Sequence, residues 1–369
     1  MRGFRGILAV LLISCGLVAP AGAASAHPPG YAGYLFVYFT GEGTADGEQV
    51  YFGLSQGNDP LRWREPSGRP ALRSTLGTGG VRDPFVIRSP RGDRFYLIAT
   101  DLRMYGRDDW ETTWRHGSRS IVVWESKDLV RWSAPRLVQV APEAAGNVWA
   151  PEAFYDPVRG EYVVFWASTI YPADDPGHTT QSYNRIVYAT TRDFRTFSAP
   201  KPWFDPGHSV IDSTVIRHDG QYYRFSQDDR GPGGGGSTPC GRYITEEKSR
   251  VLTSRGYDLV KECIGKDAIV GGEGPLVFRS NTEKRWYLFI DEYGGRGYAP
   301  FETTDLDSGD WRPVVGAQLP GRPRHGTVLP VTRAEYDRLA ANGGRSAQVA
   351  EAGDQAGAVD RAGGGEEAR

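Results

Sequence analysis

Four carboxylic acids and one histidine stand at the head of five similar apolar segments in this chain. They are Asp83, Glu152, Asp212, Glu273 and His325, and each is followed by a short run of β-branched and aromatic residues. The five recur at intervals of roughly sixty residues, a period that is typical of the blades of a radial repeat. Since such a repeat turns its equivalent strands toward one axis, we expect the five side chains to meet there.

Three of these carboxylic acids have the types and spacing needed to hydrolyse a glycosidic bond. The reaction needs one protonated acid, which helps the leaving oxygen depart, and one ionised carboxylate on the opposite side. A third carboxylate nearby raises the pKa of the acid, because like charges in close quarters resist joint ionisation. Asp83, Asp212 and Glu273 are the candidates for these roles. The competing interpretation, in which they only bind backbone amides at strand starts, suits an isolated Asp-Pro better than a regular series.

Four further residues are predicted to contact a substrate. In an antiparallel blade the second strand ends at the face where the first begins, so Asp101 and Arg296, which follow second strands, should lie near the axis. Trp149 and Glu152 belong to the head of one repeat. Carboxylates accept hydrogen bonds from hydroxyl groups and aromatic faces cover C–H surfaces, which favours a neutral polyhydroxy ligand. For Trp149, a purely structural place at the start of its strand is an equal alternative.

The positions between the heads have the composition of strands and turns. Short β-branched and aromatic runs alternate with clusters of Gly, Pro and Asp. Clear examples are residues 95–100, 120–125, 162–166 and 185–189. The sequence shows helical periodicity only over residues 334–340. We therefore predict an all-β fold.

The two ends of the repeat complete one another. Residues 34–38, 49–55 and 61–63 resemble the later strands of a unit without its first strand, and residues 327–331 resemble a first strand without followers. Pairing these segments would remove two exposed sheet edges. We predict one domain over residues 27–342, a five-bladed β-propeller whose fifth blade joins the N-terminal strands to the strand at 327–331.

Both termini lie outside the predicted propeller. Residues 1–26 combine a charged start, an apolar stretch and a small-residue cleavage site, which is the pattern of a signal peptide for secretion. The alternative is a lipoprotein signal that would anchor the chain at the cell surface through Cys15, but the apolar residues beyond Cys15 favour plain secretion. No other stretch is long enough to cross a membrane. Residues 343–369 contain few large apolar residues, and we predict a disordered tail there.

Charge and cysteine content narrow the partners and the compartment. The 43 basic residues nearly balance the 45 acidic ones, so nothing in the net charge favours a nucleic acid or an anionic membrane as a partner. We expect a monomer that binds an oligosaccharide or polysaccharide. Cys240 and Cys263 are the two cysteines left after signal cleavage, and they could form one disulfide or remain two thiols.

The heads of the repeat, taken in order, resemble the blade-head motifs of glycoside hydrolase family 43. The resemblance covers residues 31–340 and includes the turns between strands. It is carried by the motifs Asp83-Pro84, Trp149-Ala150-Pro151-Glu152, Ile211-Asp212, Glu273-Gly274-Pro275 and Arg324-His325-Gly326. Two features depart from the family pattern: most of a blade precedes Asp83, and Glu152 stands where Asp is more usual.

The resemblance implies a mechanism and a substrate class. It implies an inverting hydrolase in which Asp83 is the general base that activates water and Glu273 is the general acid. Asp212 would tune the pKa of the acid and orient it. The implied substrates are arabinofuranosides and xylosides of plant cell-wall polysaccharides, with no required cofactor. His325 would hold a central water or a structural calcium ion, and the alternative is simple hydrogen bonding at the axis.

Two other functions stay open at this point. Arg82-Asp83-Pro84 also resembles the middle motif of the fructan-cleaving propellers of glycoside hydrolase family 32, which retain configuration. Those enzymes need a nucleophilic Asp at the head of the preceding blade, where this chain has His325, whereas Asp59 falls in an outer turn. The second alternative is a secreted carbohydrate-binding propeller without catalysis. The presence of all three candidate carboxylates argues against it, because binding alone would tolerate amides.

Overall fold

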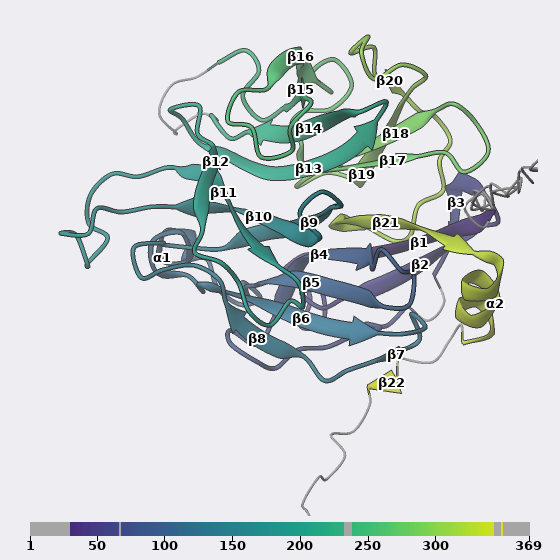
Figure 1. The fold of residues 1–369 in the computed structure, drawn as a ribbon, viewed down its shortest axis with the longest axis horizontal. Coiled ribbons are helices and arrows are strands. Elements are labelled where there is room, and N and C mark those ends of the chain that lie inside the picture. Colours follow the sequence, from purple (N-terminus) through teal and green to yellow (C-terminus); the bar gives the residue numbers. More distant parts are fainter. Residues whose placement is uncertain (1–29, 66–67, 232–237, 343–347, 350–369) are drawn as a thin grey trace, which may run out of the picture. The chain divides into compact units, whose positions relative to one another are not determined.

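The first strands of five sheets form a closed circle of contacts. The circle runs through β4 (Val81–Arg88), β9 (Trp149–Asp156), β13 (Val210–His218), β17 (Glu273–Arg279) and β21 (Arg324–Thr332), and returns to β4. Each of these strands heads its own sheet, so the computed structural model is a five-bladed β-propeller, which confirms the predicted fold (Figure 1). The structure describes residues 30–65, 68–231, 238–342 and 348–349.

Within blades 1 to 4 the strands follow one another outward from the axis in chain order. Blade 1 contains β4, β5 (Phe95–Asp101) and β6 (Ser120–Ser126), with β7 (Arg131–Trp132) and β8 (Arg136–Gln139) both paired to β6. Blade 2 contains β9, β10 (Glu161–Thr169), β11 (Asn184–Thr191) and β12 (Lys201–Phe204). Blade 3 contains β13, β14 (Gln221–Asp228), β15 (Ile244–Ser249) and β16 (Asp258–Ile264). Blade 4 contains β17, β18 (Trp286–Glu292), β19 (Gly297–Thr303) and β20 (Arg312–Pro313).

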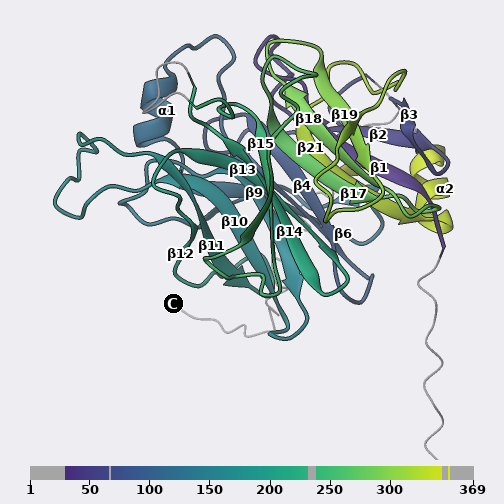
Figure 2. The ribbon, with the colours of Figure 1, turned by 90° about the horizontal axis from the view of Figure 1, so that it is seen from above.

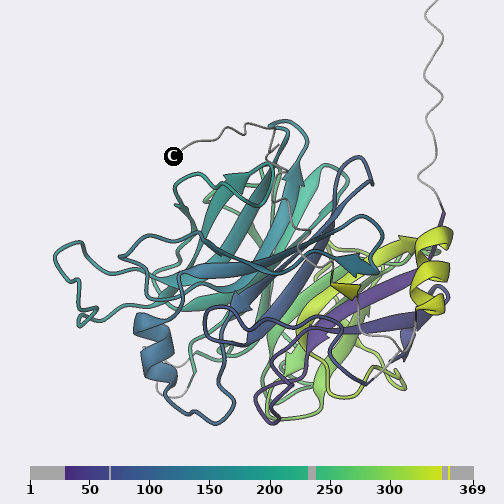
Figure 3. The ribbon, with the colours of Figure 1, turned by 90° about the horizontal axis from the view of Figure 1, so that it is seen from below.

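Blade 5 takes its strands from both ends of the propeller sequence. β21 pairs with β1 (Tyr31–Phe39), which is followed by β2 (Tyr51–Gln56) and β3 (Asp59–Arg64). The register places Leu35 opposite Leu329 and Val37 opposite Thr327. β1 is buried after its first residue. The predicted closure is therefore confirmed, and Figures 1 and 3 show yellow β21 beside purple β1.

Aromatic side chains fill the space between blades 4 and 5. Tyr34 lies edge-on to Phe278 with ring centroids 5.5 Å apart, and Phe36 lies edge-on to Phe289 at 6.4 Å. Both pairs belong to a buried cluster that joins β1 to β17 and β18. Such pairs contribute roughly 0.5–1.5 kcal/mol each beyond the area that they bury. Apolar contacts therefore pack blade 4 against blade 5, and the polar residues at the strand heads are not needed for that packing.

Two helices lie on opposite sides of the blades (Figure 2). α2 (Arg333–Ala341) follows β21 and begins with a capping box between Thr332 and Glu335, as the sequence predicts for residues 334–340. α1 (Trp110–His116) follows β5 and was not predicted, because seven residues are too few to show helical periodicity. Among the residues that the structure describes, no helix has the length and apolarity needed to cross a membrane.

The ends of the chain are described only in part. The predicted signal peptide at 1–26 lies outside the described residues. Of the predicted tail at 343–369, the structure describes only β22 (Gln348–Val349), which pairs in parallel with β7. The described residues from Tyr31 onward belong to one compact unit.

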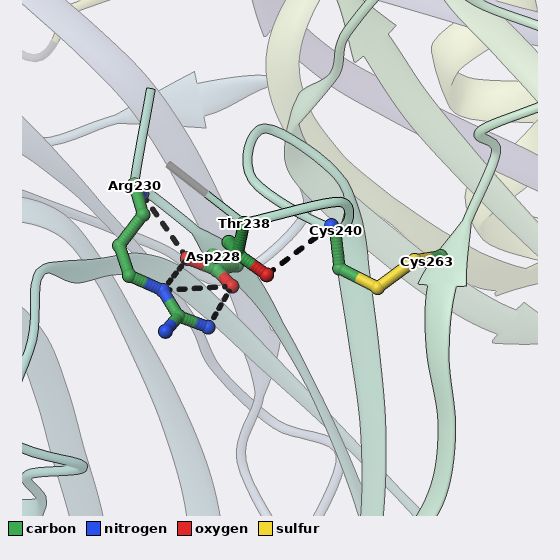
Figure 4. Close-up of a disulfide and its surroundings, with 5 residues drawn as sticks. All are labelled: Asp228, Arg230, Thr238, Cys240 and Cys263. Atoms are coloured by element: carbon green, nitrogen blue, oxygen red, sulfur yellow. Dashed lines mark hydrogen bonds and ion pairs between the residues drawn. A yellow bond between two sulfur atoms is a disulfide. The ribbon is translucent and has the colours of Figure 1, made fainter. Parts of the chain in front are cut away.

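Cys240 and Cys263 form a disulfide (Figure 4). Their Cα atoms are 4.6 Å apart, within the usual range for such a bond. The disulfide joins the loop between β14 and β15 to the end of β16. Of the two possibilities that the sequence left open, one disulfide or two thiols, the structure has the disulfide.

Arg224 on β14 is a buried cation between blades 2 and 3. Its guanidinium lies over three aromatic rings, at 4.0 Å from Phe204, 4.2 Å from Tyr257 and 4.9 Å from Trp203. Nε and Nη2 both donate to Oε2 of Glu247, at 3.3 and 2.7 Å. One side chain thus connects β12, β14 and β15 through its planar shape as well as its charge.

We predict that Arg224→Lys lowers the free energy of unfolding by about 2 kcal/mol, because an ammonium keeps the charge but cannot stack on three rings. Arg255, between β15 and β16, is exposed, so Arg255→Lys is the matched control and should change stability by less than about 0.5 kcal/mol. Urea denaturation of the wild type and both variants measures the difference. Equal effects of the two substitutions would contradict this role of Arg224.

Candidate active site

The inner strand of every blade contains one extra residue at its head. A bulge with one more residue than the partner strand occurs at Arg82/Phe85, Trp149/Glu152, Ile211/Thr214, Glu273/Leu276 and Arg324/Gly326. A β-bulge bends its strand and redirects side chains. Five bulges at equivalent places therefore turn the heads away from the regular pleat and toward the axis.

Four of these bulges contain a residue with left-handed backbone: Asp83, Ala150, Asp212 and Gly274, with φ of 52°, 49°, 53° and 51°. Gly274 is required at its position, because a Cβ there would lie 2.6 Å from Cγ of His325. Asp83 and Asp212 are thus structural counterparts. Glu273 lies one residue before the left-handed Gly274, and Glu152 lies two residues after the left-handed Ala150. The five predicted heads are therefore not all equivalent.

His325 lies at the centre of the cluster. Its Nδ1 is 3.4 Å from Oδ1 of Asp83 and 3.6 Å from Oδ2 of Asp212. Burial alone would lower the pKa of His325, but the charges of Asp212 and Asp83 raise this pKa to about 10. The side chain is therefore an imidazolium at neutral pH, buried between two carboxyl groups of different blades.

Asp83 is held in its ionised form. Burial alone would raise the pKa of Asp83, but the hydrogen bond and charge of His325 bring it below its ordinary value. Oδ2 also accepts a 2.7 Å hydrogen bond from the hydroxyl of Thr100. The same hydroxyl oxygen accepts from the backbone N–H of Ala150 at 2.8 Å, which links blade 1 to blade 2.

Asp212 lies next to the backbone of the Glu273 strand. Its Oδ2 accepts a 2.9 Å hydrogen bond from the N–H of Gly274. Burial raises the pKa of Asp212 to about 6, helped by the charge of Asp83 and opposed by that of His325. Asp212 thus touches both the cation at the axis and the residue that follows Glu273.

Glu273 has the raised pKa that a proton donor needs. Its Oε1 accepts a 2.7 Å hydrogen bond from Nη2 of Arg324, whose Nε donates to Oδ2 of Asp291 at 2.6 Å. Burial, followed by the charge of Asp291, raises the pKa of Glu273 to about 8 against the opposing charge of Arg324. The side chain is 25% exposed, compared with 14% for Asp83 and 9% for Asp212. Glu273 is therefore the most accessible of the three candidate carboxylic acids.

Glu152 joins the same cluster from blade 2. It is buried, and burial raises its pKa to about 8, with Thr214 as a hydrogen-bond partner and Asp212 close enough to add to the shift. Glu152 is thus neutral at pH 7. Among the four acidic heads, the pKa of Asp83 is therefore lowered and those of Asp212, Glu273 and Glu152 are raised, and at pH 7 Glu273 and Glu152 are the neutral pair.

Trp149 lies at the edge of the cluster beside an aromatic residue that sequence analysis did not select. The indole of Trp149 is half-buried and lies edge-on to that of Trp110 on α1, with ring centroids 6.4 Å apart. The guanidinium of Arg82 lies 5.1 Å from the Trp110 ring. Trp110 is 42% exposed, so an apolar ring is available beside Arg82, the residue that precedes Asp83.

The other two predicted substrate contacts, Asp101 and Arg296, form their hydrogen bonds and ion pairs with residues outside the five heads. Asp101 is buried, and its Oδ1 accepts from the N–H and hydroxyl of Thr78 at 2.8 and 2.9 Å. Its carboxylate holds the loop before β4. Arg296 is largely exposed and pairs with Glu292 at 2.9 Å. In this structure neither residue contacts the five heads.

Arg324 and Tyr298 are further members of the site that received no role in the sequence analysis. Arg324 directly precedes His325 and carries the cation beside Glu273. Tyr298 donates to the carbonyl of Gly274 and accepts from the N–H of Gly326, both at 2.8 Å. Arg324 could have been selected from the sequence, because it stands directly before His325 in the fifth head motif. Tyr298 lies on a third strand, which no pattern placed at the axis.

A calcium ion on His325 does not fit this arrangement. Nδ1 of the imidazole faces two carboxyl groups as a cation, whereas calcium takes oxygen ligands. Among the residues that the structure describes, no three His, Cys, Asp or Glu side chains are grouped to hold a metal ion. The imidazolium itself occupies the position of positive charge between the carboxyl groups.

The chain is similar in sequence to known glycosyl hydrolases. The family model related to glycosyl hydrolase family 43 and described as "Probable glycosyl hydrolase domain" matches residues 29–337. An alpha-L-arabinofuranosidase of Bifidobacterium longum subsp. longum is 36% identical over 276 residues, which cover 68% of this chain and 25% of that protein. The chain thus spans about a quarter of the length of the curated relative that it matches.

Two of the solved structures that match this chain are a GH62 catalytic domain and a family-43 glycoside hydrolase. The catalytic domain of a GH62 alpha-L-arabinofuranosidase from Coprinopsis cinerea matches with a TM-score of 0.45 and 14% identity, covering 81% of this chain and 78% of that one. A thermostable family-43 glycoside hydrolase matches with a TM-score of 0.44 and 20% identity, covering 66% and 76%.

Proposed function

Because the chain belongs to the glycosyl hydrolase family related to family 43, we propose that it is an inverting glycoside hydrolase acting on α-L-arabinofuranosides or β-xylosides. One observation carries the proposal: Asp83 and Glu273 have pKa values shifted in opposite directions within one cluster. A glycosidase needs this pair, one carboxylate and one carboxylic acid, whether it inverts or retains configuration. The inverting outcome is the part of the proposal that the resemblance to family 43 implies. The substrate class is supported by the printed activity of the Bifidobacterium relative.

Glu273 is the proposed general acid. With a pKa of about 8 it is protonated at neutral pH, and it is the most accessible of the three candidates. Arg324 contacts one carboxyl oxygen and leaves the other to face the leaving oxygen of a substrate. Protonation of that oxygen avoids an alkoxide leaving group and accelerates glycosidic cleavage.

Asp83 is the proposed general base. The neighbouring imidazolium keeps it ionised, so it can accept a proton from water as that water attacks the anomeric carbon. Asp212 is the proposed tuning residue, because its charge adds to the raised pKa of Glu273 while its Oδ2 holds the N–H of Gly274.

The geometry argues against a retaining mechanism of the fructan-cleaving type. Such a mechanism needs a nucleophilic carboxylate at the head of the blade before β4. That head is His325, and Asp59 begins β3 as an exposed residue at the outer side of blade 5. A non-catalytic binder is less well supported, because sugar binding does not require opposite pKa shifts in two carboxyl groups.

Export from the cell is part of the proposal. It is supported by the signal pattern at residues 1–26 and by the Cys240–Cys263 disulfide. Disulfides persist in oxidising compartments and are rare in the reducing cytosol.

We predict that Asp83→Asn lowers kcat by roughly 10²–10⁴-fold on every substrate. Glu273→Gln should cause a similar loss on oligosaccharides and a smaller one on 4-nitrophenyl glycosides, because nitrophenolate leaves without protonation. Neither substitution should lower the melting temperature enough to indicate a misfolded protein. Asp219→Asn, at a carboxylate that is 85% exposed, is the control. Equal background release by wild type and Glu273→Gln on arabinofuranosides and xylosides would favour the sugar-binding alternative.

The pH dependence of kcat/KM should follow the ionisation of Glu273. The acid must be protonated, so activity is retained below its pKa of about 8 and falls tenfold per pH unit above it. The acid limb should lie below the ordinary range of an Asp, because the pKa of Asp83 is lowered. In Glu273→Gln, the residual activity on 4-nitrophenyl glycosides should lack the alkaline limb. Persistence of this limb in the variant would assign it to another group.

The first sugar released should have the anomeric configuration opposite to that of the substrate. Proton NMR of the reaction within the first minutes, before mutarotation, identifies the anomer. Release of the same anomer would replace the inverting mechanism with a retaining one.

A further inference from the structure

The backbone around Glu273 depends on contacts from other strands. Its neighbours are Gly272 and Gly274, and glycine restricts the backbone less than any other residue. Gly274 is held by Asp212 and by the hydroxyl of Tyr298. Gly272 donates its N–H to the carbonyl of Arg242 at 2.8 Å. The position of the backbone just before Glu273 thus depends on the loop between β14 and β15.

That loop is attached to the end of β14. Arg242 donates its N–H to the carbonyl of Asp228 at 2.7 Å, and Asp228 donates to the carbonyl of Tyr243 at 3.0 Å. The carboxylate of Asp228 is paired with Arg230, with contacts of 2.9 and 2.6 Å (Figure 4). These contacts fix one side of the loop.

The disulfide fixes the other side. Cys240 lies two residues before Arg242, and its partner Cys263 lies on β16, from which the chain runs directly to Gly272. Residues 240–242, the disulfide, residues 263–272 and the Gly272–Arg242 hydrogen bond form a closed loop, which we call the blade-3 ring. The hydroxyl of Tyr243 strengthens it by donating to the carbonyl of Val270 at 3.1 Å.

The space around Gly272 makes this position sensitive to small movements. A Cβ on Gly272 would lie 2.2 Å from a side-chain carbon of Ile290 and 2.8 Å from one of Ile269. Ile269 itself belongs to the blade-3 ring. A shift of residues 263–272 would therefore move the packing that seats the backbone of Glu273.

We propose that the Cys240–Cys263 disulfide positions Glu273 for proton transfer to the leaving group, an inference that rests on the proposed role of Glu273 as the acid. The disulfide is a positioning element, since it does not touch the cluster itself. Loss of the bond would let residues 263–272 move relative to Arg242. A displacement of about 1 Å can lower a rate by up to roughly 10²-fold when a reacting group must be aligned.

The test compares wild type with the Cys240→Ser/Cys263→Ser double variant. We expect kcat for oligosaccharides to fall about tenfold, and kcat for 4-nitrophenyl glycosides to fall less than about twofold, because only the former need the acid. Arg224→Lys is the control: it weakens blade 3 at β14 but leaves the blade-3 ring intact, so it should affect both substrates equally. Assays are run well below the unfolding temperature of every variant.

Hydrogen exchange separates this inference from the proposed function, because it does not depend on turnover. In the double variant, peptides covering residues 265–274 should exchange faster by about tenfold, while those of β18 stay as in wild type. Unchanged exchange of residues 265–274, or an equal loss of activity on both substrates, would overturn the positioning role. Faster exchange in a protein whose wild type cleaves neither substrate would uphold the role of the ring and refute the proposed hydrolase activity.

Discussion

The buried charge of His325 is the interaction on which the axis depends. Asp83 and Asp212 face the same imidazole from different blades, and two buried carboxylates at that range would repel one another without a cation between them. The cation keeps Asp83 ionised while burial keeps Glu273 and Glu152 neutral. With Arg324 beside Glu273, the charge of His325 thus allows carboxyl groups of opposite function to lie in one small volume.

The bulges explain how a regular fold produces an irregular site. All five inner strands contain the same one-residue insertion. In four of them one residue of the bulge has a left-handed backbone, and the residue type at that position differs between blades. Two blades place an Asp in that position, whereas blade 2 has Ala150 and blade 4 has Gly274. The glycine admits the ring of His325, and the acid stands one residue earlier, beside Arg324. Differences of one residue within a repeated frame therefore separate the roles of the carboxyl groups.

The sequence predicted the parts of this protein that are periodic. Blade number, ring closure and the convergence of the five heads follow from spacing and strand composition, and the structure confirms them. The helix at Trp110–His116 was missed because a single short turn has no period. Asp101 was placed near the axis by topology alone, but its carboxylate turns back to Thr78. Side-chain direction depends on local hydrogen bonds, and strand order does not determine it.

The joining of β1 to β21 has a consequence for biogenesis. His325 and Arg324 lie on the strand that completes the last blade, so both central cations reach the axis only when the C-terminal part of the chain has emerged. A nascent chain that has made the first four blades would have its acidic heads with Arg82 but without His325 and Arg324. Maturation of the catalytic centre and mechanical closure of the toroid are therefore one event, and a truncated translation product would lack both.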